Sequence, residues 1–216
     1  MAIRGAIFDM DGTLTESMHL WIEIGRRYLE GLGYEVSAEQ NDAMTKMLLE
    51  PMSFYMQVQF GLQKSQEQII AEINRIVEPG YFEDVTLKPG VVAFLDALRA
   101  RGVKMVVATA TDRYLTEACL KRNGIDGYFE AVFTCGEEHC NKRSSHIYDV
   151  AREFLGTAPE DTWIFEDTFV SLLGAKESCC HTLAVHDVWA EEKTEQIRAL
   201  ADRYVETMGD IDLNTL

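Results

Sequence analysis

The stretch Ile3-Arg4-Gly5-Ala6-Ile7-Phe8-Asp9-Met10-Asp11-Gly12-Thr13 decides the fold of this chain. Its first part, as far as Phe8, is short and mostly apolar, which is typical of a strand buried on both faces of a sheet. Two aspartates, Asp9 and Asp11, follow at once, and Gly12 then allows the chain to turn sharply. The stretch therefore predicts a buried strand that delivers two carboxylates to the sheet edge where open α/β folds bind ligands.

Further apolar runs along the chain have the same character. They are Val103–Ala108, Ala131–Thr134, Thr162–Phe165 and Thr182–Val185. Helical patterns separate them, one opened by Pro89, one capped by Asp112, and one from about Ser145 to Gly156. In the last of these we expect the inner face to carry Ile147, Val150, Ala151 and Phe154. Strands that alternate with helices predict an α/β fold with a Rossmann-like, doubly wound parallel sheet.

The interval between the first two strands is too long for a simple crossover, which takes about 30 residues. Its pattern is helical: Trp21, Ile24, Tyr28 and Leu32 share one helical face, and Ser65-x-x-Gln68 is a capping box. We therefore expect a core domain of residues 1–15 and 86–216, with a small α-helical cap domain of residues 16–85 inserted after the first strand. Insertions at this edge of a sheet often act as lids over the site there.

Composition excludes several classes of protein. The 216 residues include 20 Lys and Arg but 36 Asp and Glu, for a formal net charge of −16, which disfavours binding to nucleic acid and to anionic membranes. No apolar run approaches a membrane span, and the first residues lack the apolar core of a signal peptide. Five Cys without a CxxC pair disfavour both a disulfide framework and a zinc site. We expect a cytoplasmic monomer with reduced thiols.

Polar residues also stand at the ends of the later strands. Thr109 and Ala110 end the second strand, where a hydroxyl and backbone N–H groups before a helix can cradle a phosphate. Lys142 precedes the helix near 145 and could neutralise an anion there, and Glu166-Asp167 could bind a hard cation such as Mg²⁺. Taken singly, each has an ordinary structural reading: a helix cap for the Thr or the acidic pair, and a solvated surface charge for the Lys. Their succession at four strand ends favours a common site.

With these motifs the sequence resembles the haloacid dehalogenase superfamily, in the subgroup of phosphatases with a small helical cap. Asp9-Met-Asp11-Gly12-Thr13-Leu14 matches the family's first motif, Thr109 the second, Lys142 the third, and Glu166-Asp167 the fourth. The resemblance implies that Asp9 is the nucleophile, that Asp11 is the general acid and base, and that an aspartyl phosphate forms. It also implies that Mg²⁺ is held by Asp9, by the backbone of Asp11 and by the acidic pair, chiefly Asp167.

The third motif departs from the common Lys-Pro-x-Pro pattern, because this chain reads Lys142-Arg143-Ser144-Ser145. The cation is kept, but the loss of both prolines predicts a less rigid loop. Four carboxylates, those of Asp9, Asp11, Glu166 and Asp167, would face only one ammonium without the metal. We therefore expect substrate binding to require Mg²⁺, and the crowding of acids to favour a proton on Asp11.

The expected substrate is a small phosphorylated metabolite. A sugar phosphomutase of the β-phosphoglucomutase type is the first alternative, although those enzymes usually carry Val where Thr13 stands. A phospho-accepting signalling switch is an alternative from another class, but such domains are shorter and lack the cap and the second Asp. A dehalogenase is disfavoured by Asp11. In the cap, His19 and Lys46 are candidates to bind the leaving group, set against the simpler reading of a linker hydrogen bond and a solvated surface charge.

Overall fold

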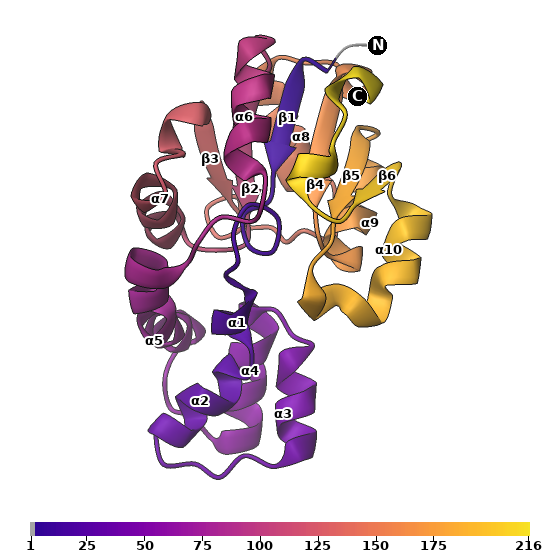
Figure 1. Ribbon diagram of the computed structural model, residues 1–216. Coiled ribbons are helices and arrows are strands. Elements are labelled where there is room, and N and C mark those ends of the chain that lie inside the picture. Colours follow the sequence, from indigo (N-terminus) through magenta and orange to yellow (C-terminus); the bar gives the residue numbers. More distant parts are fainter. Residues whose placement is uncertain (1–2) are drawn as a thin grey trace. The chain divides into compact units, whose positions relative to one another are not determined.

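The computed structural model describes residues 3–216, which form two compact units (Figure 1). The core unit runs to Ser17 and resumes from Val85 to Leu216, and the helical unit is Met18–Asp84. The chain passes between them at Ser17/Met18 and at Asp84/Val85, close to the boundaries expected from sequence. That these units are independent domains stays a prediction.

The core unit contains one parallel sheet of six strands in the order β3-β2-β1-β4-β5-β6. The strands are β1 (Gly5–Phe8), β2 (Lys104–Thr109), β3 (Ala131–Thr134), β4 (Thr162–Glu166), β5 (His181–Val185) and β6 (Arg203–Val205). Its α-helices are α6 (Val91–Ala100), α7 (Arg113–Arg122), α8 (His146–Leu155), α9 (Phe169–Glu177) and α10 (Thr194–Leu200). Short 3₁₀ turns are η2 (Asp126–Tyr128), η3 (Pro159–Asp161), η4 (Val188–Lys193), η5 (Met208–Asp210) and η6 (Leu213–Thr215). This order confirms the doubly wound α/β fold, and it puts the switch in winding direction between β1 and β4.

Alternation along the central strands builds a hydrophobic layer on each face of the sheet. Ile7 of β1 and Ile164 of β4 point to one face, where they pack with α8. Phe8 and Phe165, the next residues, point to the other face and stack on each other at 4.5 Å, with Phe94 of α6 edge-on to both. Because both faces are covered, the middle strands read as continuous apolar runs.

The inner face of α8 is rotated from the one expected. Ile147, Tyr148, Ala151 and Leu155 are buried, whereas Phe154 is 52% exposed, so its expected place in the core is wrong. The reason is Tyr148, whose polar hydroxyl suggests a surface position. It is fully buried because that hydroxyl has a buried carboxylate to bind, and the helix turns accordingly.

Strand β6 was not expected from the sequence. It is three residues long, half exposed, and pairs only with β5, so it lacks the apolar run that marks the other strands. Its position is specified by pairing with β5 at the edge of the sheet, which is a long-range effect that local pattern does not carry.

The helical unit consists of α1 (Met18–Trp21), α2 (Ile24–Gly31), α3 (Ala38–Thr45), α4 (Leu49–Phe60) and α5 (Gln66–Pro79), which continues into the π-helical turn η1 (Gly80–Asp84). The expected single face from Trp21 to Leu32 is wrong, because Glu23 adopts a left-handed φ of 51° that breaks the helix. The capping box of Ser65 and Gln68 is confirmed at the start of α5.

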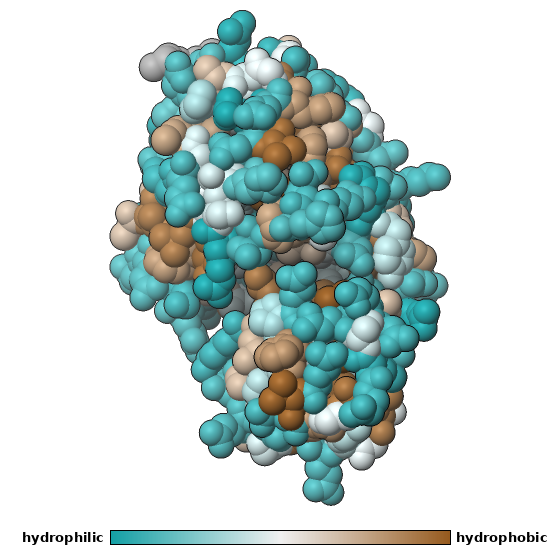
Figure 2. All heavy atoms as spheres, turned by 180° about the vertical axis from the view of Figure 1, so that it is seen from behind, coloured by the Kyte–Doolittle hydropathy of each residue, from teal (hydrophilic) through white to brown (hydrophobic). Residues whose placement is uncertain are grey.

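Among residues 3–216, no helix combines the length and the apolar character that crossing a bilayer requires. Hydrophilic residues predominate on the face shown in Figure 2, with apolar groups between them. This agrees with a chain whose acidic residues greatly outnumber its basic ones.

Candidate active site

A compact turn directly after β1 carries Asp9 and Asp11. The carbonyl of Met10 accepts hydrogen bonds from Leu14 N (2.9 Å), Thr15 N (3.0 Å) and Thr15 Oγ1 (3.0 Å). Gly12 has a φ of 86°, a conformation that side chains rarely tolerate. The turn therefore holds both aspartates at the carboxyl edge of the sheet, as the sequence predicts.

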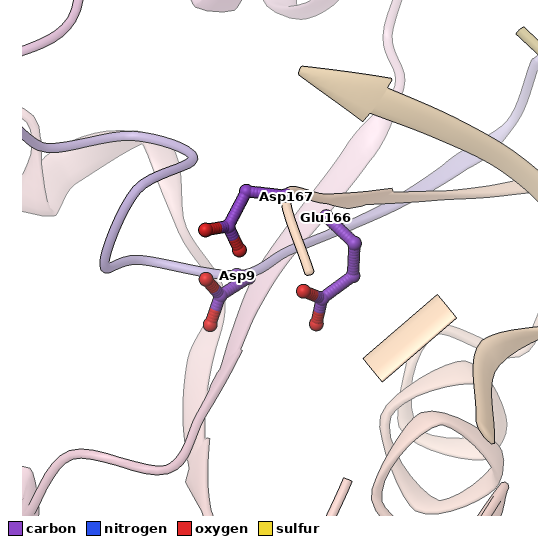
Figure 3. A group of neighbouring side chains, drawn as sticks. All are labelled: Asp9, Glu166 and Asp167. Carbon is purple, nitrogen blue, oxygen red and sulfur yellow. The ribbon is translucent and has the colours of Figure 1, made fainter. Parts of the chain in front are cut away.

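Three carboxylates from two neighbouring strands meet at this edge. Asp9 follows β1, while Glu166 ends β4 and Asp167 follows it; ligand oxygens of all three lie within 4.8 Å of one another. Figure 3 shows the three side chains gathered where the two strands end. The N–H of Asp9 donates to the carbonyl of Phe165 at 2.9 Å. This hydrogen bond fixes the register of the two strand ends. All three residues are buried, so their charges are poorly screened by solvent.

Lys142, from the segment between β3 and α8, supplies the positive charge inside this cluster. Its Nζ donates to Asp9 Oδ1 and, at 2.6 Å, to Glu166 Oε1, and its side chain is 8% exposed. Burial alone lowers the pKa of Lys142, but the carboxylates of Asp9 and Glu166 outweigh burial and raise that pKa above its ordinary value. Lys142 is therefore a permanent cation that joins β1 to β4.

The loop of Lys142 is held by close packing rather than by prolines. A side chain at Gly174 of α9 would collide with the carbonyl oxygen of Lys142 and lie within 2.7 Å of that of Ser144. The backbone of the loop thus lies directly on α9. The effect of the missing prolines on the rigidity of this loop stays a prediction.

Glu166 has a buried partner that the sequence analysis did not find. The hydroxyl of Tyr148 donates to Glu166 Oε1 at 2.8 Å, while Glu166 Oε2 has no hydrogen-bond partner among the described residues. Burial raises the pKa of Glu166 to about 7, with Asp9 adding to the rise and Lys142 opposing it. The helix after β4 is capped by Thr168, which accepts from Ser171 N, so the reading of the acidic pair as a helix cap is wrong.

Asp11 lies outside the group of three carboxylates whose ligand oxygens meet within 4.8 Å, so the expected crowding of four carboxylates is corrected to three. Asp11 has its own hydroxyl partners. Thr111 Oγ1 donates to Asp11 Oδ2 at 2.7 Å, and Ser17 Oγ donates to Asp11 Oδ1 at 2.5 Å. Neither partner was singled out from the sequence. Both come from positions that are distant in the chain or hidden in the linker, and only the fold brings them to Asp11.

The end of β2 carries Thr109, which is fully buried, and Ala110, which is exposed. The expected cradle of free N–H groups needs a correction, because the N–H of Thr111 donates to Thr109 Oγ1 at 3.0 Å. A hydroxyl that accepts one hydrogen bond keeps its own proton, so Thr109 remains able to donate to an anion.

A further buried ion pair lies beside the turn. Lys88 Nζ contacts Asp187 Oδ2 at 2.7 Å and the carbonyl of Gly12 at 2.6 Å. Asp187 also acts on Asp167. Burial is the main cause that raises the pKa of Asp167, and the carboxylates of Asp9, Glu166 and Asp187 raise it further. In the sequence, Lys88 is marked only weakly, as a lysine within a segment that otherwise has the composition of a turn.

The site residues expected in the helical unit are both exposed. His19 belongs to α1, and Lys46 follows α3 and is paired with Asp42 at 2.6 Å, with 71% of its side chain exposed. They belong to a different unit from the carboxylate cluster.

The donor set is suited to a hard divalent cation. Mg²⁺ prefers carboxylate and carbonyl oxygens, and the cluster offers three buried carboxylates, one of which has an oxygen without a hydrogen-bond partner among the described residues. Burial is the first cause of the raised pKa values of Glu166 and Asp167, and the neighbouring carboxylate of Asp9 adds to both.

Comparison with known proteins gives a consistent result. The haloacid dehalogenase-like hydrolase family matches residues 6–185. Hexitol phosphatase A of Escherichia coli is 27% identical over 195 residues, which cover 86% of this chain and 84% of that protein. Phosphoglycolate phosphatase of Synechococcus elongatus is 26% identical and covers 97% and 95% of the two chains. The crystal structure of CbbY from Rhodobacter sphaeroides in complex with phosphate has the same fold, with a TM-score of 0.81 at 20% identity and 96% of each chain covered.

Proposed function

The chain belongs to the haloacid dehalogenase-like hydrolases, and from this premise we propose that it is a Mg²⁺-dependent phosphatase of small phosphate monoesters. The observation that carries the proposal is the buried cluster in which Asp9 lies against Lys142, Glu166 and Asp167. Two curated relatives, a hexitol phosphatase and a phosphoglycolate phosphatase, support a phosphorylated metabolite as the substrate.

In the first step, a carboxylate oxygen of Asp9 attacks phosphorus in line with the ester oxygen. The P–O bond of the ester breaks, an aspartyl phosphate forms, and the leaving alkoxide takes a proton from Asp11. In the second step, Asp11 accepts a proton from water as that water attacks phosphorus. The Asp9–phosphorus bond then breaks, and inorganic phosphate and free Asp9 result.

The remaining residues would orient the reactants and balance their charge. Lys142 holds Asp9 in place and faces the phosphoryl oxygens, and the hydroxyl of Thr109 donates to them. Thr111 and Ser17 fix the carboxyl group of Asp11. Asp9, Asp167 and Glu166, with the backbone carbonyl of Asp11, would hold Mg²⁺, which when bound supplies charge that offsets the carboxylates and the phosphoryl group.

The experiment compares the wild type with Asp9→Asn on a panel of hexitol phosphates, sugar phosphates, phosphoglycolate and an aryl phosphate, with and without Mg²⁺. We expect phosphate release by the wild type only with Mg²⁺, and none by Asp9→Asn, because the amide removes the attacking charge while keeping the volume. Near-wild-type turnover by a purified Asp9→Asn protein would contradict the nucleophile. Isomerised sugar phosphate without phosphate release would favour the mutase instead.

We also propose that Lys46 and His19 bind the leaving group. Among residues 3–216, the exposed ammonium of Lys46 pairs only with Asp42 at the surface, and a substrate could displace a pair of such low energy. Lys46→Ala should lower kcat/KM for the best polar substrate of the panel much more than for acetyl phosphate. Equal losses on both substrates would remove Lys46 from substrate selection.

A further inference from the structure

Lys88 of the core unit makes three strong contacts and has no part in the chemistry proposed above. Its Nζ donates to Gly12 O (2.6 Å), His186 O (2.7 Å) and Asp187 Oδ2 (2.7 Å). The side chains of Lys88 and Asp187 are 7% and 2% exposed. An ammonium has three N–H groups, so every donor is used and the side chain is held in one position.

The backbone around Lys88 is fixed to the same turn. Lys88 N donates to Leu14 O at 2.9 Å, and Glu16 N donates to Thr86 O at 2.9 Å. The segment that returns to the core unit at Val85 therefore runs antiparallel to the segment that leaves it. The ammonium adds a third point of attachment, on the Gly12–Thr13 peptide, one residue beyond Asp11.

That peptide is the part of the turn with the greatest need of restraint. Gly12 has a φ of 86° and, as a glycine, has the largest conformational freedom of any residue. A rotation of the Gly12 peptide would move Asp11, whose carboxylate must stay within reach of both Thr111 and the reacting oxygen. A misplacement of about 1 Å can cost about 10²-fold in rate.

We infer that Lys88 is a positioning residue for the proposed phosphatase reaction. Its ammonium donates a hydrogen bond to the Gly12 carbonyl and thereby holds Asp11 where it can transfer a proton. The inference rests on the proposed function. The competing explanation is that Lys88 serves only to neutralise the buried Asp187, since breaking a buried ion pair is costly wherever it lies.

Two substitutions separate these explanations. Lys88→Met removes the contact with Gly12 and keeps the length of the side chain. Asp187→Asn removes the charge pair but leaves Nζ its bonds to Gly12 and His186. We expect Lys88→Met to lose about 10²-fold in kcat on an alkyl phosphate, with a smaller loss on an aryl phosphate and little change in KM, while Asp187→Asn keeps most of its kcat.

Lys176→Met is the matched control. Lys176 also pairs with an aspartate, Asp202, at 2.7 Å, but has no contact with the turn, so its loss should leave kcat unchanged. In protein labelled with ¹⁵N-glycine, the amide resonance of Gly12 should shift strongly in Lys88→Met and weakly in Asp187→Asn. If Lys88→Met does not fold, Lys88→Arg keeps the charge for Asp187 but replaces the ammonium by a larger planar group, and the amide resonance of Gly12 then reports whether the contact with Gly12 is lost.

The inference would be overturned if Lys88→Met and Asp187→Asn lost kcat equally. It would also be overturned if Lys88→Met lost kcat equally on alkyl and aryl esters. Neither result would contradict the proposed phosphatase activity. Full activity in a folded Lys88→Met protein, or in a Lys88→Arg protein whose Gly12 resonance shows that the contact is lost, would likewise overturn the inference alone. A wild type that releases no phosphate from any ester of the panel would instead overturn the proposed function, and the inference with it.

Discussion

Asp9 and Asp11 are two residues apart in the chain but lie in different electrostatic surroundings. Asp9 is bound by the ammonium of Lys142 beside Glu166, whereas Asp11 accepts hydrogen bonds from the hydroxyls of Thr111 and Ser17. The ion pair holds the carboxylate of Asp9 in one position, as the attack proposed for it requires. The two hydroxyl groups hold the carboxyl group of Asp11 from both of its oxygens. The two different roles proposed for these residues thus go with two different sets of partners.

Replacing Asp11 by Asn should impair proton transfer while keeping the backbone carbonyl. General acid–base groups typically contribute about 10²–10⁴-fold to the rate, so we expect a loss of that order in kcat on an alkyl phosphate. An aryl phosphate has a better leaving group and needs little protonation, so its loss should be smaller. Steady-state kinetics on both esters measures the difference, and identical losses would argue against Asp11 as the acid.

At the scale of elements, most of the sheet could be predicted because its central strands are buried on both faces. Strands β1, β2, β4 and β5 each read as an apolar run, and the polar residues at the carboxyl ends of β1, β2 and β4 were expected from the same pattern. Strand β6 and the rotated face of α8 could not be predicted this way. Both depend on partners elsewhere in the chain, β5 in one case and the carboxylate of Glu166 in the other.

Helix α9 and the Lys142 loop form one packed element through Gly174. Gly174→Ala should force the two backbones apart and so displace Lys142 from Asp9, because the new methyl group collides with the carbonyl of Lys142. We expect a loss of about 1–3 kcal/mol in the free energy of unfolding, typical of overpacking, together with a fall in kcat. Denaturant unfolding and steady-state kinetics measure the two effects.

Gly31→Ala is the control, since Gly31 also lies in a helix but a methyl group there meets nothing within 4 Å. It should leave kcat unchanged and stabilise slightly, because alanine favours the helix. If Gly174→Ala behaved like Gly31→Ala, the loop of Lys142 would not depend on this contact.

Asp202 links three elements of the core unit. Its carboxylate accepts from Thr182 N (2.8 Å) and Thr182 Oγ1 (3.0 Å) at the start of β5 and from Lys176 Nζ (2.7 Å) of α9. Burial acts to raise the pKa of Asp202, but Lys176 and Thr182 outweigh it, so the folded pKa lies below its ordinary value of 3.8. A depressed pKa contributes stability that is present above pH 3.8 and is lost as the pH falls through the folded pKa.

Asp202→Asn should therefore lower the free energy of unfolding at pH 7 by about 1 kcal/mol, after allowance for solvent screening of a partly exposed group. The difference from the wild type should shrink below about pH 4, as the wild-type carboxyl takes up its proton. Urea unfolding at pH 7 and at pH 3 measures this. Lys176→Met keeps the bonds to Thr182 and should retain part of the pH dependence; a constant difference across the range would refute the linkage.

At the scale of the whole molecule, the site is assembled from segments that the sequence separates widely. Lys142 reaches Asp9 across 133 positions, and Lys88 reaches Asp187 across 99. The first pair could be anticipated because both residues stand at strand ends that a parallel sheet brings to one edge. The second could not, because neither residue follows a strand in a recognisable motif and their meeting depends on how the returning linker packs.

Mg²⁺ should stabilise the fold as a whole, because the ligands proposed for it come together from two strands in the folded protein and not in the unfolded chain. A ligand present at 100 times its dissociation constant adds about 2.7 kcal/mol, which for a chain of this size corresponds to a rise in Tm of about 5–10 °C. Asp167→Asn should remove most of that rise. Without Mg²⁺ the variant should be at least as stable as the wild type at pH 7.5, since burial and the neighbouring carboxylates raise the pKa of Asp167, and the amide relieves that repulsion.

The order of the two melting temperatures should therefore reverse as Mg²⁺ is added. Without the ion, the variant should melt at the same temperature as the wild type or at a higher one. At the end of the titration, the wild type should melt at the higher temperature. Thermal unfolding across a Mg²⁺ titration measures this without any substrate, and a monovalent salt at matched ionic strength controls for general screening of a chain with a net charge of −16. A simple structural role for Asp167 predicts the opposite starting order, because loss of a stabilising side chain lowers Tm with or without the ion. An equal rise in both proteins would place the ion away from Asp167, and no rise in the wild type would contradict a magnesium site at the end of β4.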